Sequence, residues 1–177
     1  MSKYKKIIHA LCLSIMLNSA GAIAQTCQTT TIPATTPTSR FSVPGNGTVT
    51  DIKTGLMWKQ CSEGQSGADC SAGGAAGYSW AGALQQAQAV NSSGGFAGFT
   101  DWRVPNVKEL RSITERQCYN PAINSAVFPN TASTWYWSSS PVADNSGSAW
   151  IVPFGYGYDL WYYKYNDNYV RLVRSGQ

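Results

Sequence analysis

Four cysteines restrict the fold of this chain more than any other feature of its sequence. They follow an N-terminal segment, residues 1–24, in which lysines precede an apolar run from Ile7 to Leu17 and which closes with Ala22-Ile23-Ala24. That pattern is typical of a signal peptide for export. The cysteines that would remain in the exported chain are Cys27, Cys61, Cys70 and Cys118. An even number in an exported chain predicts two disulfides.

Four cysteines allow three connectivities, and the sequence alone leaves the choice among them open. We expect Cys61 to pair with Cys70, which closes a short polar loop, and Cys27 to pair with Cys118, which ties down the N-terminal segment of the exported chain. A zinc site is a poor alternative, because the spacing is not that of paired C-x-x-C motifs.

The charge of the exported chain is close to neutral. Three of the 13 Lys and Arg residues lie in the signal, which leaves ten basic residues against nine acidic ones. The global electrostatic argument for nucleic acid or an anionic membrane therefore loses its main support. No later stretch approaches the apolar length of a bilayer span, so we predict no membrane anchor. The location expected is the periplasm, the cell surface or the extracellular space.

Histidine chemistry is absent from the predicted mature chain, because the one histidine, His9, lies in the signal. Ser-His, Cys-His and His-metal arrangements are therefore ruled out there, and we expect neither an enzyme, nor a cofactor, nor a metal. Nine carboxylates are present, and a glycosidase needs only two. A cell-envelope enzyme with a carboxylate pair therefore stays open as an alternative, although nothing in the sequence marks a pair.

The order of patterns predicts an α+β fold. A Thr/Pro-rich stretch, 25–44, is expected to form an extended arm rather than a packed element. A single domain, 45–177, should follow, with a hairpin of strands at 48–52 and 56–59 and helices at 80–91 and from 107 to near Cys118. The strands expected after these helices are 135–139, 149–154, 159–163 and 169–174.

Aromatic residues fill half of the segment from Phe154 to Tyr169, interleaved with Asp and Asn. A strand buries one face, so alternate rings should point outward, and exposed Tyr with Asn and Asp is the composition of a recognition surface. The alternative is that the whole run is core and edge packing. The expected ligand-binding residues are Tyr156, Tyr158, Asp159, Trp161, Tyr162, Tyr163, Tyr165, Asn166, Asp167 and Asn168, with help from Arg171.

A second candidate is an anion-binding patch along the second predicted helix and its entry. It consists of Arg103, Lys108, Arg111 and Arg116. Glu109 and Glu115 lie among them, so a solvated, salt-bridged helix face is the simpler interpretation. A local site for sulfated glycans is the alternative.

Nine short motifs in one order resemble the Lcl C-terminal domain family, named for the terminal domain of a bacterial collagen-like adhesin. They are Gly47-Thr48-Val49-Thr50-Asp51, Thr54-Gly55-Leu56-Met57-Trp58, Asp101-Trp102-Arg103-Val104-Pro105, Lys108-Glu109-Leu110, Pro121-Ala122-Ile123-Asn124, Phe128-Pro129-Asn130, Trp137-Ser138-Ser139-Ser140, Ala149-Trp150 and Val170-Arg171-Leu172-Val173-Arg174. The resemblance implies a C-type-lectin-like fold, with two helices packed on antiparallel β-sheet, long loops and two disulfides. It also implies an adhesion function.

Two departures from that family limit what the resemblance implies. The chain has no Gly-X-Y repeat, so a collagen stalk and the trimer it promotes do not carry over, and the oligomeric state stays open. The Glu-Pro-Asn tripeptide of calcium-dependent lectins is also absent.

The function predicted from the sequence is a secreted or periplasmic adhesion module that recognises a glycan or an extracellular protein through its aromatic C-terminal surface. One alternative is a binding protein diversified by a retroelement, since such systems leave Tyr, Asn, Asp and Ser at exposed positions. Another is an envelope component that binds nothing specifically.

Overall fold

A computed structural model describes residues 24–176 of the protein, so the predicted signal peptide lies outside the described residues except for Ala24. Two helices and several small antiparallel sheets make up the fold, as expected for an α+β protein. The helices are α1 (Trp80–Ser92) and α2 (Val107–Ser112), with a short 3₁₀ turn η1 (Thr38–Arg40) before the first sheet. Within the described residues, no helix is long and apolar enough to cross a membrane.

Strands of two main sheets hold the fold together. A four-stranded sheet has the order β11-β4-β3-β2, and a three-stranded sheet has the order β10-β9-β8. Their bounds are β2 (Phe41–Ser42), β3 (Thr48–Asp51), β4 (Leu56–Lys59), β8 (Trp135–Val142), β9 (Asn145–Pro153), β10 (Leu160–Tyr163) and β11 (Val173–Ser175). Two further strand pairs are β1 (Thr26–Cys27) with β7 (Cys118–Tyr119) and β5 (Gln65–Ser66) with β6 (Ala72–Gly73).

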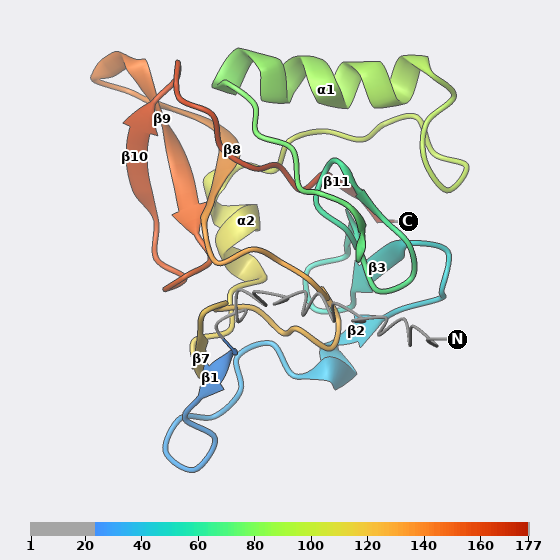
Figure 1. Ribbon diagram of the computed structural model, residues 1–177, viewed down its shortest axis with the longest axis vertical. Coiled ribbons are helices and arrows are strands. Elements are labelled where there is room, and N and C mark those ends of the chain that lie inside the picture. Colours follow the sequence, from blue (N-terminus) through green and yellow to red (C-terminus); the bar gives the residue numbers. More distant parts are fainter. Residues whose placement is uncertain (1–23, 177) are drawn as a thin grey trace, which may run out of the picture.

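The three-stranded sheet is packed on both faces. On one face Trp137, Ala149 and Ile151 form a core with Ala83 and Ala87 of α1. On the other face Tyr136 and Val152 form a second core with Leu110 and Ile113 at α2. Figure 1 shows α1 along the top of the molecule, this sheet on the left and α2 near the centre.

The two predicted disulfides are confirmed. Cys61 is bonded to Cys70, and Cys27 is bonded to Cys118 across a sequence separation of 91 residues. The second bond joins β1 to β7, which also pair through their backbones. It therefore anchors the N-terminal end of the described chain to the segment that follows α2.

Both helices begin where the sequence predicts, because their N-caps are formed. Ser79 accepts a hydrogen bond from the N–H of Gly82, and Asn106 with Glu109 forms a complete capping box. The prediction that the second helix reaches Cys118 is wrong, since α2 ends at Ser112. Thr114 there donates its hydroxyl to the carbonyl of Arg111 and pairs with Ile123, so tertiary contacts replace the next helical turn.

The arm is the second point at which the structure differs from the sequence-based expectation. Phe41 is buried in the core and β2 pairs with β3, so the end of the arm is a packed element. Thr35 and Thr36 bind the buried carboxylate of Glu115 through their N–H and hydroxyl groups. The Thr/Pro-rich composition of the arm does not predict these contacts, because they depend on Glu115, which lies about 80 residues further along the chain.

The last predicted strand is also shorter than expected. Only β11 is regular, and it pairs with β4, while Tyr169 pairs with Tyr136 of β8. The segment between them therefore crosses from one main sheet to the other. Val170, Leu172 and Val173 are buried, as the apolar pattern predicts.

Candidate ligand-binding surface

Strand β10 presents two aromatic rings to solvent because its side chains alternate between two faces. Leu160 and Tyr162 pair with Ile151 and Ala149 and pack against the core under α1. Trp161 and Tyr163 pair with Trp150 and Ser148 and lie on the opposite face, where both rings are exposed. The period of two that the sequence suggests for this strand is therefore present.

Five exposed rings, which we call the aromatic surface, lie on β10 and on the segments that flank it. They are Tyr156, Tyr158, Trp161, Tyr163 and Tyr165. The most open are Tyr165 at 75% and Tyr156 at 68% of full exposure. Rings of this size at such exposure contribute little to the core, so they are available for contact with another molecule.

The rings of the aromatic surface form two groups that are held by contacts among themselves. Tyr156 and Tyr158 stack with centroids 6.1 Å apart. Tyr163 and Tyr165 are parallel at 5.5 Å, and Trp161 contacts Tyr163 edge-on at 5.6 Å. Such pairs stabilise a ring arrangement by about 1 kcal/mol each, so the surface is partly preorganised.

Gly157 allows the first of these groups to form. Its φ of +78° is a conformation that L side chains rarely adopt. A Cβ at this position would also lie 3.0 Å from the Cβ of Ala122. The turn between Tyr156 and Tyr158 therefore depends on glycine, and both tyrosine rings are brought to the same side of it.

The other predicted binding residues differ in how much of each side chain is free to contact a ligand. Asp167 is exposed. Asp159 forms an ion pair with Arg111, and Asn166 donates a hydrogen bond to the carbonyl of Tyr163. Tyr162 is half-buried, with its ring 4.4 Å from that of Trp135. The expectation that Asn168 faces a ligand is wrong, since it is only 5% exposed and its backbone pairs with Tyr78.

Arg171 is also not where the sequence analysis expects it. It is fully buried, and its guanidinium donates to the carbonyls of Lys59 and Gln60 and to the hydroxyl of Thr131. The pattern of alternating Val, Arg and Leu suggests an outward arginine. The irregular path of residues 169–172 instead turns its side chain into the core, so it has no contact with the aromatic surface.

The predicted anion patch is divided by ion pairs. Arg103 binds Glu109 through two hydrogen bonds of 2.7 Å, and Arg111 binds Asp159 with a nitrogen–oxygen distance of 2.6 Å. Lys108 and Arg116 are exposed and form no ion pair with any described residue. The helix face is therefore mainly salt-bridged, and Arg111 instead connects α2 to the start of β10.

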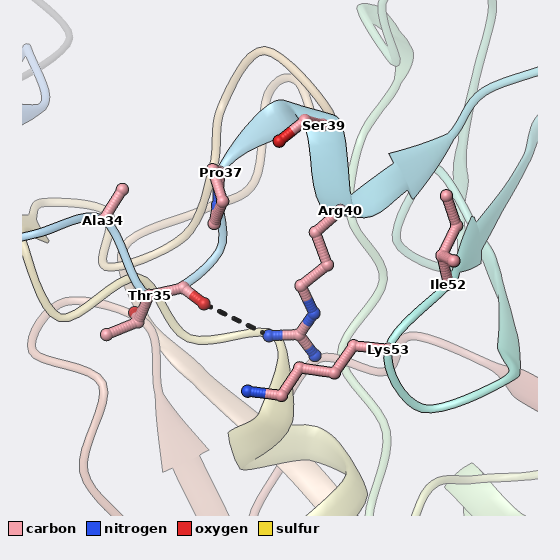
Figure 2. A pocket seen from close by; sticks show the side chains of 7 residues that line it. All are labelled: Ala34, Thr35, Pro37, Ser39, Arg40, Ile52 and Lys53. Atoms are coloured by element: carbon pink, nitrogen blue, oxygen red, sulfur yellow. Dashed lines mark hydrogen bonds between the residues drawn. The ribbon is translucent and has the colours of Figure 1, made fainter.

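A shallow basic groove lies between the arm and the β3–β4 turn, and the sequence analysis missed it. Figure 2 shows Arg40 and Lys53 in its wall, with Arg40 donating to the carbonyl of Thr35. Its volume is about 460 Å³, and an adjoining hollow of about 300 Å³ shares these three residues and adds Arg111 and Arg116. Nothing in the sequence places Arg40 near Arg116, because only the folded arm brings them together.

The charge of the groove is partly neutralised from beneath. Arg40 forms an ion pair with Asp51, a carboxylate that is fully buried. Burial by itself raises the pKa of Asp51, but hydrogen bonds from Arg40 and Thr54 and the charge of Arg40 outweigh it, so this pKa lies below its usual value. Asp51 is therefore ionised at neutral pH, and among the residues that the structure describes Lys53 and Arg116 are the cations of the groove without an ion pair.

Carboxylates in the described chain are mostly occupied by structural partners. Asp51, Asp101, Glu109 and Asp159 bind arginines, Glu63 binds Lys59, and Glu115 binds the arm. Within residues 24–176 no group of three or more His, Cys, Asp or Glu side chains is arranged to hold a metal.

Comparison with protein families gives a match to the family described as the Lcl C-terminal domain, over residues 47–174. That range contains both main sheets apart from β2 and the last residue of β11, both helices and the aromatic surface. The family is adhesin-associated and is not an enzyme family. No curated protein matches the chain.

Proposed function

This chain belongs to the Lcl C-terminal domain family, and from that premise we propose that it is an exported adhesion module whose aromatic surface binds a glycan or an extracellular protein. Two disulfides and an adhesin-associated domain are consistent with export.

The observation that carries the proposal is the exposure of Tyr156, Tyr158, Trp161, Tyr163 and Tyr165 on β10 and on the segments that flank it. Exposed apolar surface costs free energy in water, so its concentration in one place calls for a partner. Tyrosine and tryptophan provide large contact area with few rotatable bonds, and the tyrosine hydroxyl can bond sugar or peptide groups.

Support also comes from the way in which the rings are held. The Arg111–Asp159 ion pair fastens the chain just before β10 to α2. On the other side of β10, Lys164 donates to the carbonyl of Ser146 and lies 4.2 Å from the centroid of Trp80. The exposed rings therefore rest on an ordered strand, which lowers the entropy lost on binding.

The experiment is a glycan-array and host-matrix screen of residues 25–177, carried out with the native protein and a triple variant. The variant replaces Tyr158, Tyr163 and Tyr165 with Ser, and leaves the half-buried Tyr162 in place. We expect the native protein to capture a ligand and the variant to lose at least about tenfold in affinity, equal to 1.4 kcal/mol, with folding unchanged.

The matched control is Val43→Ser, which removes an apolar side chain of similar exposure to Tyr163 from the segment after β2, where it lines neither the aromatic surface nor the basic groove. This control should bind like the native protein. Equal binding by the triple variant and the native protein would contradict the proposal, and complete lack of capture would favour an envelope component without a specific ligand.

An anionic ligand in the basic groove is a second candidate, favoured by the unpaired cations Lys53 and Arg116. Binding there would weaken steeply with salt, because it would depend on exposed charges. The double variant Lys53→Gln with Arg116→Gln should then lose binding while the aromatic variant keeps it. Salt-insensitive capture would assign the ligand to the aromatic surface instead.

A further inference from the structure

The outer edge of β10 is the open edge of the three-stranded sheet. β10 is the terminal strand in the order β10-β9-β8, and Figure 1 shows it at the left margin of the molecule. The edge of β8 at the other end is covered by Tyr169, which bonds Trp135 and Trp137 through its backbone. An uncovered edge carries N–H and C=O groups that can pair with another strand.

The hydrogen-bond register shows which residues carry these groups. Lys164 donates its N–H to the carbonyl of Gly147, so the pair 164/147 is a hydrogen-bonded pair of the antiparallel ladder. Such pairs alternate, so Leu160 and Tyr162 bond to β9 while Trp161 and Tyr163 turn their groups outward. The residues with outward backbone groups are thus the ones with exposed rings.

The outward groups of Trp161 are free for a partner. No turn or side-chain hydrogen bond reaches its N–H or C=O from any described residue, whereas the carbonyl of Tyr163 already accepts from Asn166. Trp161 therefore offers one donor and one acceptor side by side. When two copies of such a residue lie opposite each other in antiparallel strands, each N–H donates to the C=O of the other copy, so both groups of both residues are bonded. This self-complementary pairing is the one that a two-fold axis generates.

Strand β10 contains no charged residue that would prevent its outer edge from pairing with another strand. Proteins protect such edges with lysine, proline or bulges, but β10 reads Leu-Trp-Tyr-Tyr and pairs with β9 without interruption. The flanking charges are engaged within their own chain, since Asp159 binds Arg111 and Lys164 binds Ser146. Two copies therefore approach each other without like charges meeting at the centre of the contact.

We propose that β10 pairs antiparallel with β10 of a second copy of this chain, with the two Trp161 residues opposite each other across a two-fold axis. The two three-stranded sheets become one continuous sheet. The rings lie on the face of that sheet and not between the strands, so two aromatic surfaces adjoin and remain accessible. A ligand with repeated epitopes then gains avidity from one dimer.

The test is the association of the ligand-free, disulfide-bonded protein, measured by sedimentation equilibrium over a wide concentration range. We expect a monomer–dimer equilibrium for the native chain. Trp161→Pro removes the outward N–H without removing any bond to β9, while Trp161→Ser removes the ring alone. The proline variant should associate about tenfold more weakly than the serine variant, as expected for the loss of two hydrogen bonds.

A second readout does not depend on tolerance of proline. Opposed Trp161→Cys residues would have Cα atoms about 5.5 Å apart, a separation that a disulfide bridges, so this variant should form a covalent dimer. The control Ile52→Cys, on the exposed β3–β4 turn, should not. A monomer at all concentrations, association unaffected by Trp161→Pro, or equal cross-linking of the two cysteine variants would each overturn the proposal. Because no ligand is present, these outcomes are independent of the adhesion function.

Discussion

Arg171 is a fully buried arginine whose polar contacts join segments that are far apart in the chain. Its guanidinium bonds the carbonyls of Lys59 and Gln60 and the hydroxyl of Thr131, and lies 4.9 Å from the centroid of Phe128. Burial lowers the pKa of Arg171 to about 10, so the side chain stays charged at neutral pH. One buried cation thereby joins the end of β4 to the loop before β8.

Replacing Arg171 with Ala should lower the free energy of unfolding by about 3 kcal/mol, because two carbonyls and a hydroxyl lose their donor in the protein interior. Urea unfolding followed by tryptophan fluorescence measures this. Arg116→Ala, at an exposed position, is the control and should change the value by less than about 0.5 kcal/mol. Similar losses of unfolding free energy in the two variants would show that the buried hydrogen bonds of Arg171 do not stabilise the fold.

Glu115 and Asp51 predict how stability depends on pH. Burial by itself raises the pKa of Glu115, but hydrogen bonds from Thr35, Gln117 and Thr36 outweigh it, and this folded-state pKa lies below the usual 4.5. The contribution to stability is therefore complete above about pH 4.5 and is lost as the pH falls through the lowered folded value. Asp51 acts in the same direction from its usual value of 3.8.

The melting temperature should accordingly be flat near neutral pH and fall in acid, and Glu115→Gln should make the acid fall smaller. Thermal unfolding between pH 7 and about pH 3 measures both effects. An unchanged acid slope in the Glu115→Gln variant would show that this carboxylate does not link the arm to the domain.

Among the elements, those with local signals were predicted well from the sequence. Ser79 and the Asn106–Glu109 capping box mark the helix starts. The strand predicted at 56–59 is confirmed, and the turn at residues 53–55 marks its start. Elements that depend on distant partners were not predicted. The early end of α2 and the pairing of β2 with β3 depend on partners beyond the next turn of the chain, and the irregular segment before β11 depends on strands β8 and β4 much earlier in the sequence.

In the candidate site, too, features that depend on local sequence were predicted and features that depend on tertiary contacts were not. Alternation along β10 is a local property, so the sequence predicts that alternate rings point outward. It does not show which ones, because Trp161, Tyr162 and Tyr163 are consecutive aromatic residues, and only the pairing with β9 turns Tyr162 inward. The burial of Asn168 and Arg171 follows from the path of the chain between two sheets. The groove with Arg40 and Lys53 forms only when the arm is folded, and no local sequence pattern predicts it.

The capping box of α2 gives a prediction for a single element. Asn106→Ala removes the hydrogen bond to the N–H of Glu109 and should lower the free energy of unfolding by about 1 kcal/mol. Asn106→Asp should retain most of it, because aspartate also caps helices well. Denaturant unfolding of the native protein and the two variants measures these free energies. Equal losses in Asn106→Ala and Asn106→Asp would contradict the prediction.

At the scale of the whole molecule, two disulfides close loops of very different length. The Cys27–Cys118 bond spans 91 residues and the Cys61–Cys70 bond spans nine. On loop-closure entropy, replacing the first pair by serines should cost roughly 4–5 kcal/mol and the second roughly 2–3 kcal/mol. Unfolding of the two double variants measures the order, and a larger loss from the short loop would contradict it.

The molecule as a whole places packed cores beside its two helices and leaves its most exposed rings on β10 and the segments that flank it. The two cores occupy opposite faces of the β10-β9-β8 sheet, so β10 receives support from within while Trp161 and Tyr163 stay outside. The folded arm forms one wall of the basic groove, and the Cys27–Cys118 disulfide anchors the start of that arm. An adhesion module needs such a division between a rigid support and an open contact surface.

The most direct measurement is oxidative footprinting of the protein with and without the ligand captured in the binding screen. We expect bound ligand to protect Tyr156, Tyr158, Trp161, Tyr163 and Tyr165 from oxidation, while exposed Ile52 and Val43 react as before. Protection centred on the groove at Lys53 and Ile52, with the five rings unchanged, would contradict the claim that the aromatic surface holds the ligand.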